Sequence, residues 1–183
     1  PLALLAPLYE QAIAPAATQP MLREPDPRPN CRLLDAGGGT GRVSGFLQEH
    51  VGSVVLSDIS MGMLREAATK DNLRPTRSLT ETLPFADAFF DCVLIVDALH
   101  HVADQAQTAR ELFRVIKPGG RVVIQEPDIR KFVVKLIAVA EKLALMRSHF
   151  LNGDKIAALF PFENAEIDIH TEDFNVWVVV KKK

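Results

Sequence analysis

The stretch LLDAGGGTGRVS, residues 33–44, decides which fold this sequence predicts. It holds one acid, Asp35, and four glycines, namely Gly37, Gly38, Gly39 and Gly41. Each glycine in place of alanine costs about 0.5–1 kcal/mol in regular structure. So many glycines in one turn indicate that the backbone there passes close to something that a side chain would block. The apolar residues before the turn predict a strand, and the residues after it predict a helix.

Composition restricts the class of protein around this turn. The chain has 183 residues, 48% of them hydrophobic and 24% charged, which is the range of one soluble globular domain. A net charge of −2 argues against a general binder of nucleic acids or membrane surfaces. Two cysteines, Cys31 and Cys92, form no CxxC pair, and this usage favours a reducing, cytoplasmic setting. We find no apolar run long enough to span a bilayer and therefore expect no integral membrane contact.

The chain alternates between strand and helix patterns. Several predicted strands are apolar without alternation, which is typical of parallel strands that are buried on both faces. The pattern predicts an α/β protein with a doubly wound, Rossmann-like, mostly parallel sheet that ends in an antiparallel strand pair. The predicted strands are residues 31–36, 54–59, 76–80, 89–97, 121–126, 165–172 and 175–182, and the predicted helices are residues 4–13, 40–50, 60–72, 105–117, 131–151 and 154–160.

We expect one domain over residues 1–183, in three parts. Residues 1–30 are rich in proline and form an approach segment to the first predicted strand. Residues 31–127 form the cofactor-binding core, and residues 128–183 carry substrate-side helices and the final strand pair. Residues 131–151 have an unusually wide apolar helical face. Two roles for this face stay open: it lines an acceptor pocket, or it forms a subunit contact, as in a homodimer.

The fold places a ligand at the carboxyl ends of the strands, beside the glycine turn. Asp58 ends the second predicted strand 17 residues after Gly41, where a carboxylate can bind ribose hydroxyls. A dinucleotide motif G-x-G-x-x-G that starts at Gly37 would need glycine at position 42, which is Arg42. The spacing is D-x-G-x-G-x-G instead. These features together indicate an adenosine-type cofactor other than a dinucleotide.

The motif LLDAGGGTGR resembles the first motif of class I S-adenosylmethionine-dependent methyltransferases. The likeness continues in VVLSDIS, ETLPFADAFFD, VDALHHV and LFRVIKPGGRVVI, and it covers residues 31–127. These motifs are similar to the small-molecule type 11 branch, which includes enzymes of ubiquinone and menaquinone biosynthesis. The resemblance implies a methyltransferase (class 2.1.1) with S-adenosylmethionine as cofactor and a small-molecule methyl acceptor, with no nucleic acid as partner.

The resemblance also assigns site residues. The glycines of the turn would let the loop pass under the cofactor, and Asp35 would fix the loop and the amino group of the methionine part. Asp58 would hold both ribose hydroxyls, and Ile59 would pack on the adenine. Family members often carry an acid and a small residue after the third strand to read adenine; here these positions are Leu79 and Thr80, so Glu81 is the nearby candidate acid. Asp97 would lie beside the methionine part and the transferred methyl group. Tyr9 resembles the aromatic residue of an N-terminal lid in this family, which makes residues 1–30 a candidate lid. The catalytic candidates are Asp97 and His101, which lie at the carboxyl end of the fourth predicted strand, where a base would be useful. The cofactor-binding candidates are Asp35, Gly37, Gly38, Gly39, Gly41, Asp58, Ile59, Leu79, Thr80, Glu81 and Asp97.

Two other functions stay open at this point. A cofactor-binding or regulatory protein without catalysis would fit the same motifs, and the missing acid at Leu79 favours it. A nicotinamide-dependent oxidoreductase would share Asp58 and the turn, but it would need the third glycine. The histidines and cysteines show no metal-ligand spacing, so we expect no metal.

Overall fold

The computed structural model describes residues 18–70, 73–132, 134–135 and 148–183. The predicted helix at 4–13 and Tyr9 lie outside the described residues, as does most of the predicted helix at 131–151. Residues 148–152, at the end of that prediction, are irregular, so the helix does not extend to residue 151.

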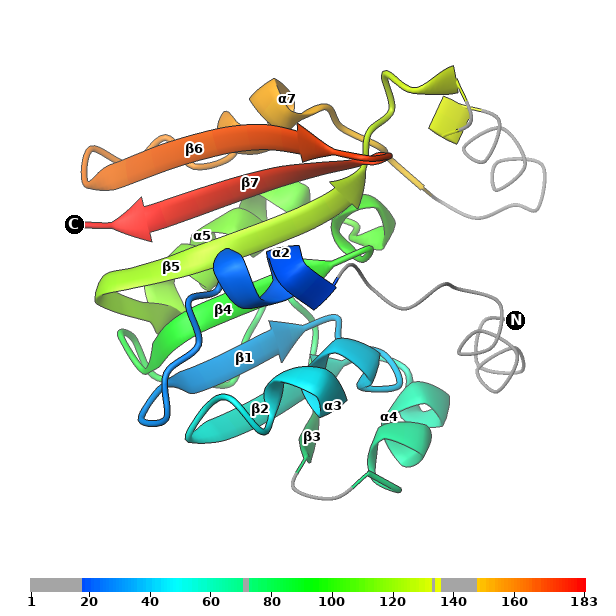
Figure 1. The fold of residues 1–183 in the computed structure, drawn as a ribbon, viewed down its shortest axis with the longest axis vertical. Coiled ribbons are helices and arrows are strands. Elements are labelled where there is room, and N and C mark those ends of the chain that lie inside the picture. The colour runs from blue at the N-terminus through cyan, green and yellow to red at the C-terminus, as the bar shows by residue number, and fades with distance from the viewer. Residues whose placement is uncertain (1–17, 71–72, 133, 136–147) are drawn as a thin grey trace.

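A seven-stranded sheet runs through the molecule in the order β3-β2-β1-β4-β5-β7-β6 (Figure 1). The pairs among β1 to β5 are parallel, and β7 is antiparallel to both β5 and β6. This arrangement confirms the doubly wound fold with its final antiparallel pair. The strands are β1 (Arg32–Ala36), β2 (Ser53–Asp58), β3 (Arg74–Arg77), β4 (Phe90–Val96), β5 (Ile116–Pro127), β6 (Ala165–Glu172) and β7 (Asn175–Lys182).

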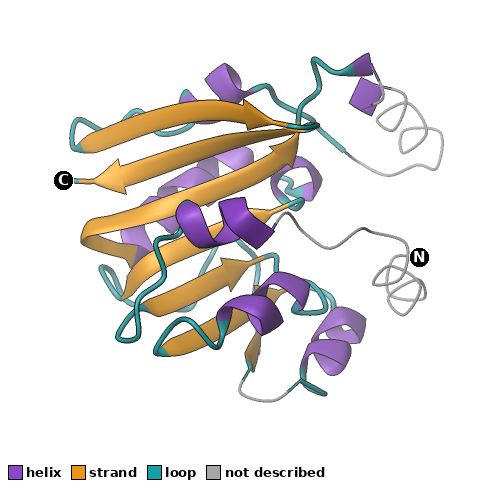
Figure 2. Cartoon of the chain, viewed as in Figure 1, coloured by secondary structure: helices purple, strands orange, loops and turns teal. Residues whose placement is uncertain are grey.

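Helices cover both faces of the sheet (Figure 2). In the view of Figure 1, α2 and α3 lie in front of the strands and α5 lies behind them. The helices are α2 (Thr18–Arg23), α3 (Arg42–Leu47), α4 (Met61–Ala67), α5 (Gln105–Val115) and α7 (Gly153–Ala157), with a short 3₁₀ turn η1 (Leu99–His101).

Local chemistry sets the helix starts. Ser60 caps α4 by accepting from the Met63 N–H at 3.4 Å, and Asp104 caps α5 by accepting from the Gln107 N–H at 2.8 Å. The starts of α4 and α5 agree with those of the predicted helices at 60–72 and 105–117. Their ends differ from the prediction, because both helices are shorter than the apolar pattern of the sequence. Helix α2 is not predicted at all; Pro20 occupies its first turn, where proline is tolerated because the N–H has no acceptor within the helix.

Two strand predictions need correction. Strand β3 ends at Arg77 rather than at residue 80, and the chain then leaves the sheet, so that residues 78–81 form a loop at its carboxyl edge. Strand β5 begins at Ile116, directly after α5, rather than at residue 121. The segment KPGG thus lies within the strand, and the pairing with β4 shifts register between Phe90 and Cys92.

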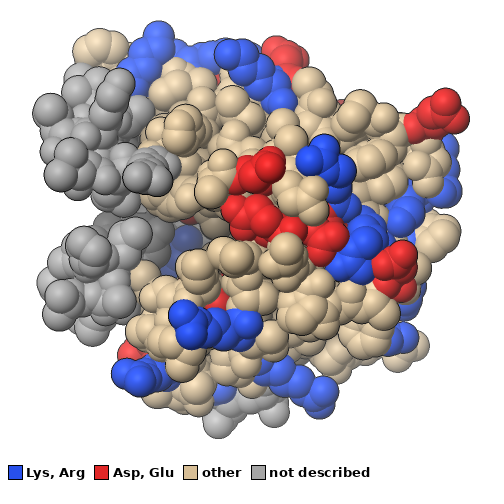
Figure 3. Space-filling model, turned by 180° about the vertical axis from the view of Figure 1, so that it is seen from behind, with Lys and Arg blue, Asp and Glu red and all other residues tan. Residues whose placement is uncertain are grey.

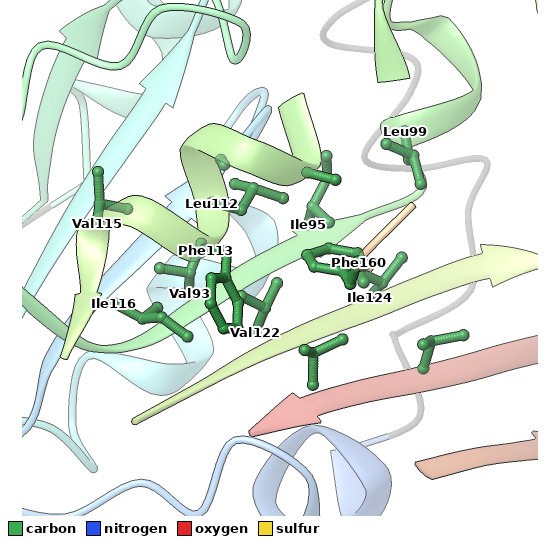
Figure 4. Packing of buried hydrophobic residues seen from close by; sticks show 14 of the residues in the cluster. Val93, Ile95, Leu99, Leu112, Phe113, Val115, Ile116, Val122, Ile124 and Phe160 are labelled. Carbon is green, nitrogen blue, oxygen red and sulfur yellow. The ribbon is translucent and has the colours of Figure 1, made fainter. Parts of the chain in front are cut away.

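The core lies on both faces of the sheet, as the unbroken apolar strands predict. One cluster packs α5 against β4, β5 and β7 and includes Leu112, Phe113 and Ile124 (Figure 4). The other packs α2 and α3 against the opposite face and includes Met21 and Trp177. Strand β7 serves both faces because its side chains alternate.

The charged surface carries both signs. On the face seen in Figure 3, basic side chains stand beside a central group of acidic ones. Within the described ranges, no helix has the length and apolar character needed to cross a membrane.

Candidate active site

Four loops at the carboxyl edge of the sheet enclose a cavity of about 370 Å³. They follow β1, β2, β3 and β4, so the cavity lies beside the point where strand order reverses between β1 and β4. Its walls are Asp35, Gly37, Gly38, Gly39, Thr40, Arg42, Val43, Asp58, Ile59, Ser60, Met63, Ser78, Leu79, Thr80, Glu81, Val96, Asp97, Ala98, His101, Val102 and Ala103.

The glycine turn forms one wall of the cavity. Gly37 and Gly39 have positive φ angles of 72° and 56°, a region that glycine enters without steric cost. A side chain at Gly37 would meet the Ala98 Cβ at 2.8 Å, whereas a Cβ built at Gly39 has no atom of the described residues within 4 Å, its chain neighbours aside. The position of Gly39 is therefore open on the side from which a ligand would approach.

Asp35 anchors the start of this turn. Its carboxylate is buried and accepts a hydrogen bond from the Ser44 hydroxyl at 2.6 Å. Burial raises the pKa of Asp35 to about 6, because desolvation disfavours the charged form more than the Ser44 hydrogen bond favours it.

Asp58, at the end of β2, connects two of the loops. One carboxylate oxygen accepts from the Gly39 N–H at 3.0 Å, and the other accepts from the Ser60 N–H at 2.7 Å. A carboxylate has about four acceptor positions, so it can bind further donors from the cavity. The side chain that the sequence assigns to the ribose also holds the glycine turn in place.

The loop after β3 brings the predicted adenine-side residues to the cavity. Leu79 is 46% exposed and lines the wall, as does Ile59, which is 55% exposed. Thr80 is buried, and its hydroxyl lies 3.1 Å from that of Thr108. The Glu81 carboxylate accepts from the N–H groups of Ala103 and Asp104 at 3.2 and 3.3 Å, so this acid fastens the neighbouring loop.

Asp97 follows β4 with a φ of 51°, a left-handed conformation that aspartate tolerates better than most residues. Its carboxylate lies 3.7 Å from the Arg42 guanidinium. Burial, together with the negative charge of Glu126, raises the pKa of Asp97 to about 6 against the opposing effect of Arg42. The cavity therefore holds an acid whose charge is poorly stabilised by the protein.

Glu126, at the end of β5, holds the turn η1 in place through hydrogen bonds to its backbone. It accepts from the N–H groups of Ala98 and Leu99 at 3.0 and 2.7 Å, and its other oxygen lies 2.5 Å from His100 Nδ1. His101, next in the chain, lines the cavity and lies 3.3 Å from the Ser148 hydroxyl through Nδ1.

Ten of the eleven predicted cofactor-binding residues line this cavity. Gly41 does not, because a side chain there would point toward Leu56 and Leu73, away from the cavity. Sequence reasoning missed Arg42, Met63 and Val102 among others. Arg42 has a detectable signal, since it stands directly after the glycine turn at the position where a dinucleotide motif would have glycine. The described residues include no group of three or more metal-ligating side chains.

Comparison with known proteins matches residues 34–124 to a family described as "Methyltransferase domain". The ubiquinone/menaquinone biosynthesis C-methyltransferase UbiE of Vibrio cholerae is 38% identical over 109 residues, which are 54% of this chain and 42% of the relative. The chain thus spans less than half the length of this relative.

Solved structures share the fold. A SAM-dependent methyltransferase from Thermotoga maritima superposes with a TM-score of 0.81 at 19% identity, covering 99% of this chain and 97% of its own. The [4+2]-cyclase SpnF superposes with a TM-score of 0.74 at 18% identity, covering 92% of this chain and 71% of its own. Likeness at this identity establishes the fold, and one fold supports more than one reaction.

Proposed function

We propose that the chain is a class I S-adenosylmethionine-dependent methyltransferase that transfers a methyl group from S-adenosylmethionine to a small-molecule acceptor. The match of residues 34–124 to a methyltransferase domain and the 38% identity to a UbiE protein support this proposal. The observation that carries the proposal is the cavity at the carboxyl edge of the sheet. There, the open position of Gly39 and the carboxylate of Asp58 lie on one wall, joined by a 3.0 Å hydrogen bond.

The residues around the cavity fit this cofactor chemically. Asp58 offers acceptor positions for two ribose hydroxyls, and the absence of a side chain at Gly39 leaves room beside it. Ile59 and Leu79 are exposed apolar side chains on the cavity wall, and they would pack on the adenine ring. Asp35, Gly37 and Gly38 would border the methionine part, as would Asp97, which follows the neighbouring strand β4.

The cofactor, when bound, supplies a methyl group that is already electrophilic. The protein then contributes mainly orientation and exclusion of water, which can account for much of the reduction in barrier. We assign Asp97 to the cofactor side and His101 to the acceptor side. His101 is the candidate base if the methyl acceptor must lose a proton, because it lines the cavity and an imidazole nitrogen can accept a proton.

The name of a relative supports one acceptor class as the first to test. The UbiE protein of Vibrio cholerae is named for C-methylation in ubiquinone and menaquinone biosynthesis, so hydroquinones are the first acceptors to test. A cofactor-binding protein without methyl transfer is the rival function. The missing acid at Leu79 favoured it from sequence, and the cyclase with this fold shows that the architecture does not determine the reaction.

Ligand-dependent stability tests the proposal. S-adenosylhomocysteine at one hundred times its dissociation constant should add about 2.7 kcal/mol to the free energy of unfolding, measured by urea titration. NADH should add nothing, because Arg42 replaces the third glycine of a dinucleotide motif. Stabilisation by NADH and not by S-adenosylhomocysteine would overturn the proposal. Transfer of labelled methyl from S-adenosylmethionine to a hydroquinone panel then separates the enzyme from its non-catalytic rival.

Two glycines provide a matched pair of variants. Gly39 and Gly119 both have positive φ, and apart from chain neighbours no described residue comes within 4 Å of a Cβ built at either. Gly119 lies in β5, outside the lining of the cavity. Both Gly39→Val and Gly119→Val should lower stability through backbone strain. The stabilisation by S-adenosylhomocysteine should disappear in Gly39→Val and persist in Gly119→Val. If both variants lost this stabilisation equally, the glycine turn would not be part of the binding site.

A further inference from the structure

The turn η1 and residues 148–150, which lie far apart in the sequence, are fastened to each other. The His149 N–H donates to the His100 carbonyl at 2.7 Å. The Gln105 side-chain amide donates at 2.9 Å both to the His149 carbonyl and to a carbonyl of the turn. The Phe150 ring stacks on the His100 ring, with centroids 4.3 Å apart and planes 14° apart. These contacts fix the backbone of residues 148–150 against the turn.

Ser148 stands in this segment beside the candidate base. Its hydroxyl oxygen lies 3.3 Å from His101 Nδ1. The His101 ring also lies against the His100 ring, with centroids 3.9 Å apart. His100 is itself buried, and its Nδ1 lies 2.5 Å from a Glu126 oxygen. The imidazole of His101 is thus placed by a ring beside it and by a hydroxyl group at one of its nitrogens.

The two nitrogens of a neutral imidazole have different roles. One carries a proton and donates, whereas the other carries a lone pair and accepts. Because Nδ1 of His101 lies at the Ser148 hydroxyl, a proton from a methyl acceptor would have to go to Nε2. Nε2 can accept it only when the ring proton is on Nδ1. A serine hydroxyl has two lone pairs, so it can accept a hydrogen bond from that N–H.

We propose that Ser148 is a positioning residue for His101, whose Nδ1–H donates to the Ser148 hydroxyl and so keeps the lone pair on Nε2. The proposal rests on the proposed function, in which His101 is the candidate base. Nε2 would take the proton of the methyl acceptor, and the electron pair left behind stays on the acceptor atom for the new bond to the methyl carbon. The same Nδ1–H donates in the resulting imidazolium, where the hydrogen bond is charge-assisted and therefore stronger. Ser148 thus supports His101 before and after the proton moves.

NMR of the protein with isotope-labelled histidine tests the assignment directly, because the two neutral tautomers give different nitrogen chemical shifts. The measurement is made at about pH 8, where histidine is mostly neutral, and His101→Gln identifies the His101 signals. Wild-type His101 should be mainly in the Nδ1–H form. Ser148→Ala should lower the ratio of Nδ1–H to Nε2–H by about twofold to tenfold, the effect of losing one neutral hydrogen bond. Ser148→Thr keeps a hydroxyl group and should restore the ratio.

The signals of His50 provide a control within the same spectra. His50 packs against Phe46 of α3, with ring centroids 5.7 Å apart, and its signals should not change in Ser148→Ala. Wild-type His101 mainly in the Nε2–H form would overturn the inference, and this result needs no variant to fold. A tautomer ratio that Ser148→Ala leaves unchanged would overturn it as well.

Methyl transfer to a hydroquinone measures the consequence for the reaction. Ser148→Ala should lower kcat by about twofold to tenfold and leave KM for S-adenosylmethionine within about twofold, because Ser148 does not line the cofactor cavity. Ser148→Thr should recover kcat. A change in KM without a change in kcat would overturn the positioning role.

The tautomer measurement requires neither cofactor nor methyl acceptor, so its outcome is separate from the test of the proposed function. Failure of S-adenosylhomocysteine to stabilise the wild-type protein would count against the proposed function. An Nε2–H tautomer in a protein that S-adenosylhomocysteine does stabilise would overturn the role of Ser148 alone.

Discussion

The buried carboxyl group of Asp35 links the stability of the fold to pH. Its pKa is about 6 in the folded protein and about 3.9 in an unfolded chain. Between these values the folded state binds more protons than the unfolded state. The contribution of Asp35 to stability is therefore full below about pH 4 and is lost as the pH rises through 6.

Asp35→Asn should remove this loss, since the amide keeps an oxygen for the Ser44 hydroxyl and carries no charge to bury. We expect the variant to exceed the wild type by about 1–3 kcal/mol in free energy of unfolding at pH 8. The difference should shrink to near zero at pH 4. Urea titrations of both proteins across this pH range provide the measurement. If the difference in free energy of unfolding did not depend on pH, ionisation of Asp35 would not destabilise the folded protein.

Leu79 determines how the adenine base would be read. An apolar side chain cannot accept a hydrogen bond from the adenine amino group, and the Glu81 carboxylate is engaged by the loop at Ala103 and Asp104. Leu79→Asp should tighten S-adenosylhomocysteine by about 1–2 kcal/mol, the effect of one charged hydrogen bond less some desolvation. It should leave the inosine analogue unchanged, and Leu79→Ala should show no such preference. Calorimetry with both ligands provides the measurement. Equal tightening of S-adenosylhomocysteine and its inosine analogue by Leu79→Asp would contradict the prediction.

Glu81→Ala separates the two roles of that acid. The structure gives Glu81 a part in holding the loop, so the variant should weaken S-adenosylhomocysteine and its inosine analogue alike. Selective weakening of the adenine ligand would mean that Glu81 reads the base, as the sequence left open. Amide hydrogen exchange at Ala103 and Asp104 should rise in the variant under the first interpretation.

Among the elements, the end of β5 controls the turn η1. Glu126 is buried and accepts from the N–H groups of Ala98 and Leu99 while contacting His100. Glu126→Ala would leave these buried donors without their acceptor, and we expect a loss of about 3–5 kcal/mol in free energy of unfolding. Glu49→Ala, at an exposed position, should stay within about 0.5 kcal/mol of the wild type.

Hydrogen exchange distinguishes a local effect of this variant from a global one. Exchange of the Ala98 and Leu99 amides should accelerate in Glu126→Ala more than exchange of the amides in β1, because their acceptor is gone. A uniform increase across the sheet would show that the carboxylate stabilises the whole fold rather than the turn.

Across the whole molecule, β7 joins the two core clusters. Its Val176, Val178 and Val180 lie in the cluster beneath α5, while Trp177 and Val179 lie in the cluster beneath α2 and α3. Strand β7 is therefore part of the central core rather than an appendage, and the described sheet should unfold as one cooperative unit.

Trp177→Ala tests this integration. The indole is 1% exposed, so its removal should cost about 3–5 kcal/mol in free energy of unfolding. Phe174→Ala, in the exposed turn before β7, should cost less than about 1 kcal/mol. Urea unfolding should remain a single transition with an unchanged slope. Two transitions in Trp177→Ala would show that the strand pair unfolds separately from the rest of the sheet.

The sequence by itself determined the features that short-range chemistry specifies. The glycines of residues 37–41, the capping side chains of Ser60 and Asp104 and the apolar runs of β1, β4 and β7 each act on their own neighbourhood. The fold class, the final strand pair and the loops that line the cavity were predictable from these residues. Helix ends and the bounds of β3 and β5 were not, since burial against other elements decides where a weak helix or strand stops.

Tertiary structure decided the contacts between residues far apart in the chain. The approach of Arg42 to Asp97, the binding of η1 by Glu126 and the engagement of Glu81 by the loop at Ala103 all depend on strand order and register. No local pattern encodes such pairs, because each partner is an ordinary polar residue in its own segment. Burial then sets their chemistry: the same carboxyl group that titrates near 4 in an unfolded chain reaches a pKa of about 6 at Asp35 and Asp97 once the sheet and its loops remove it from water.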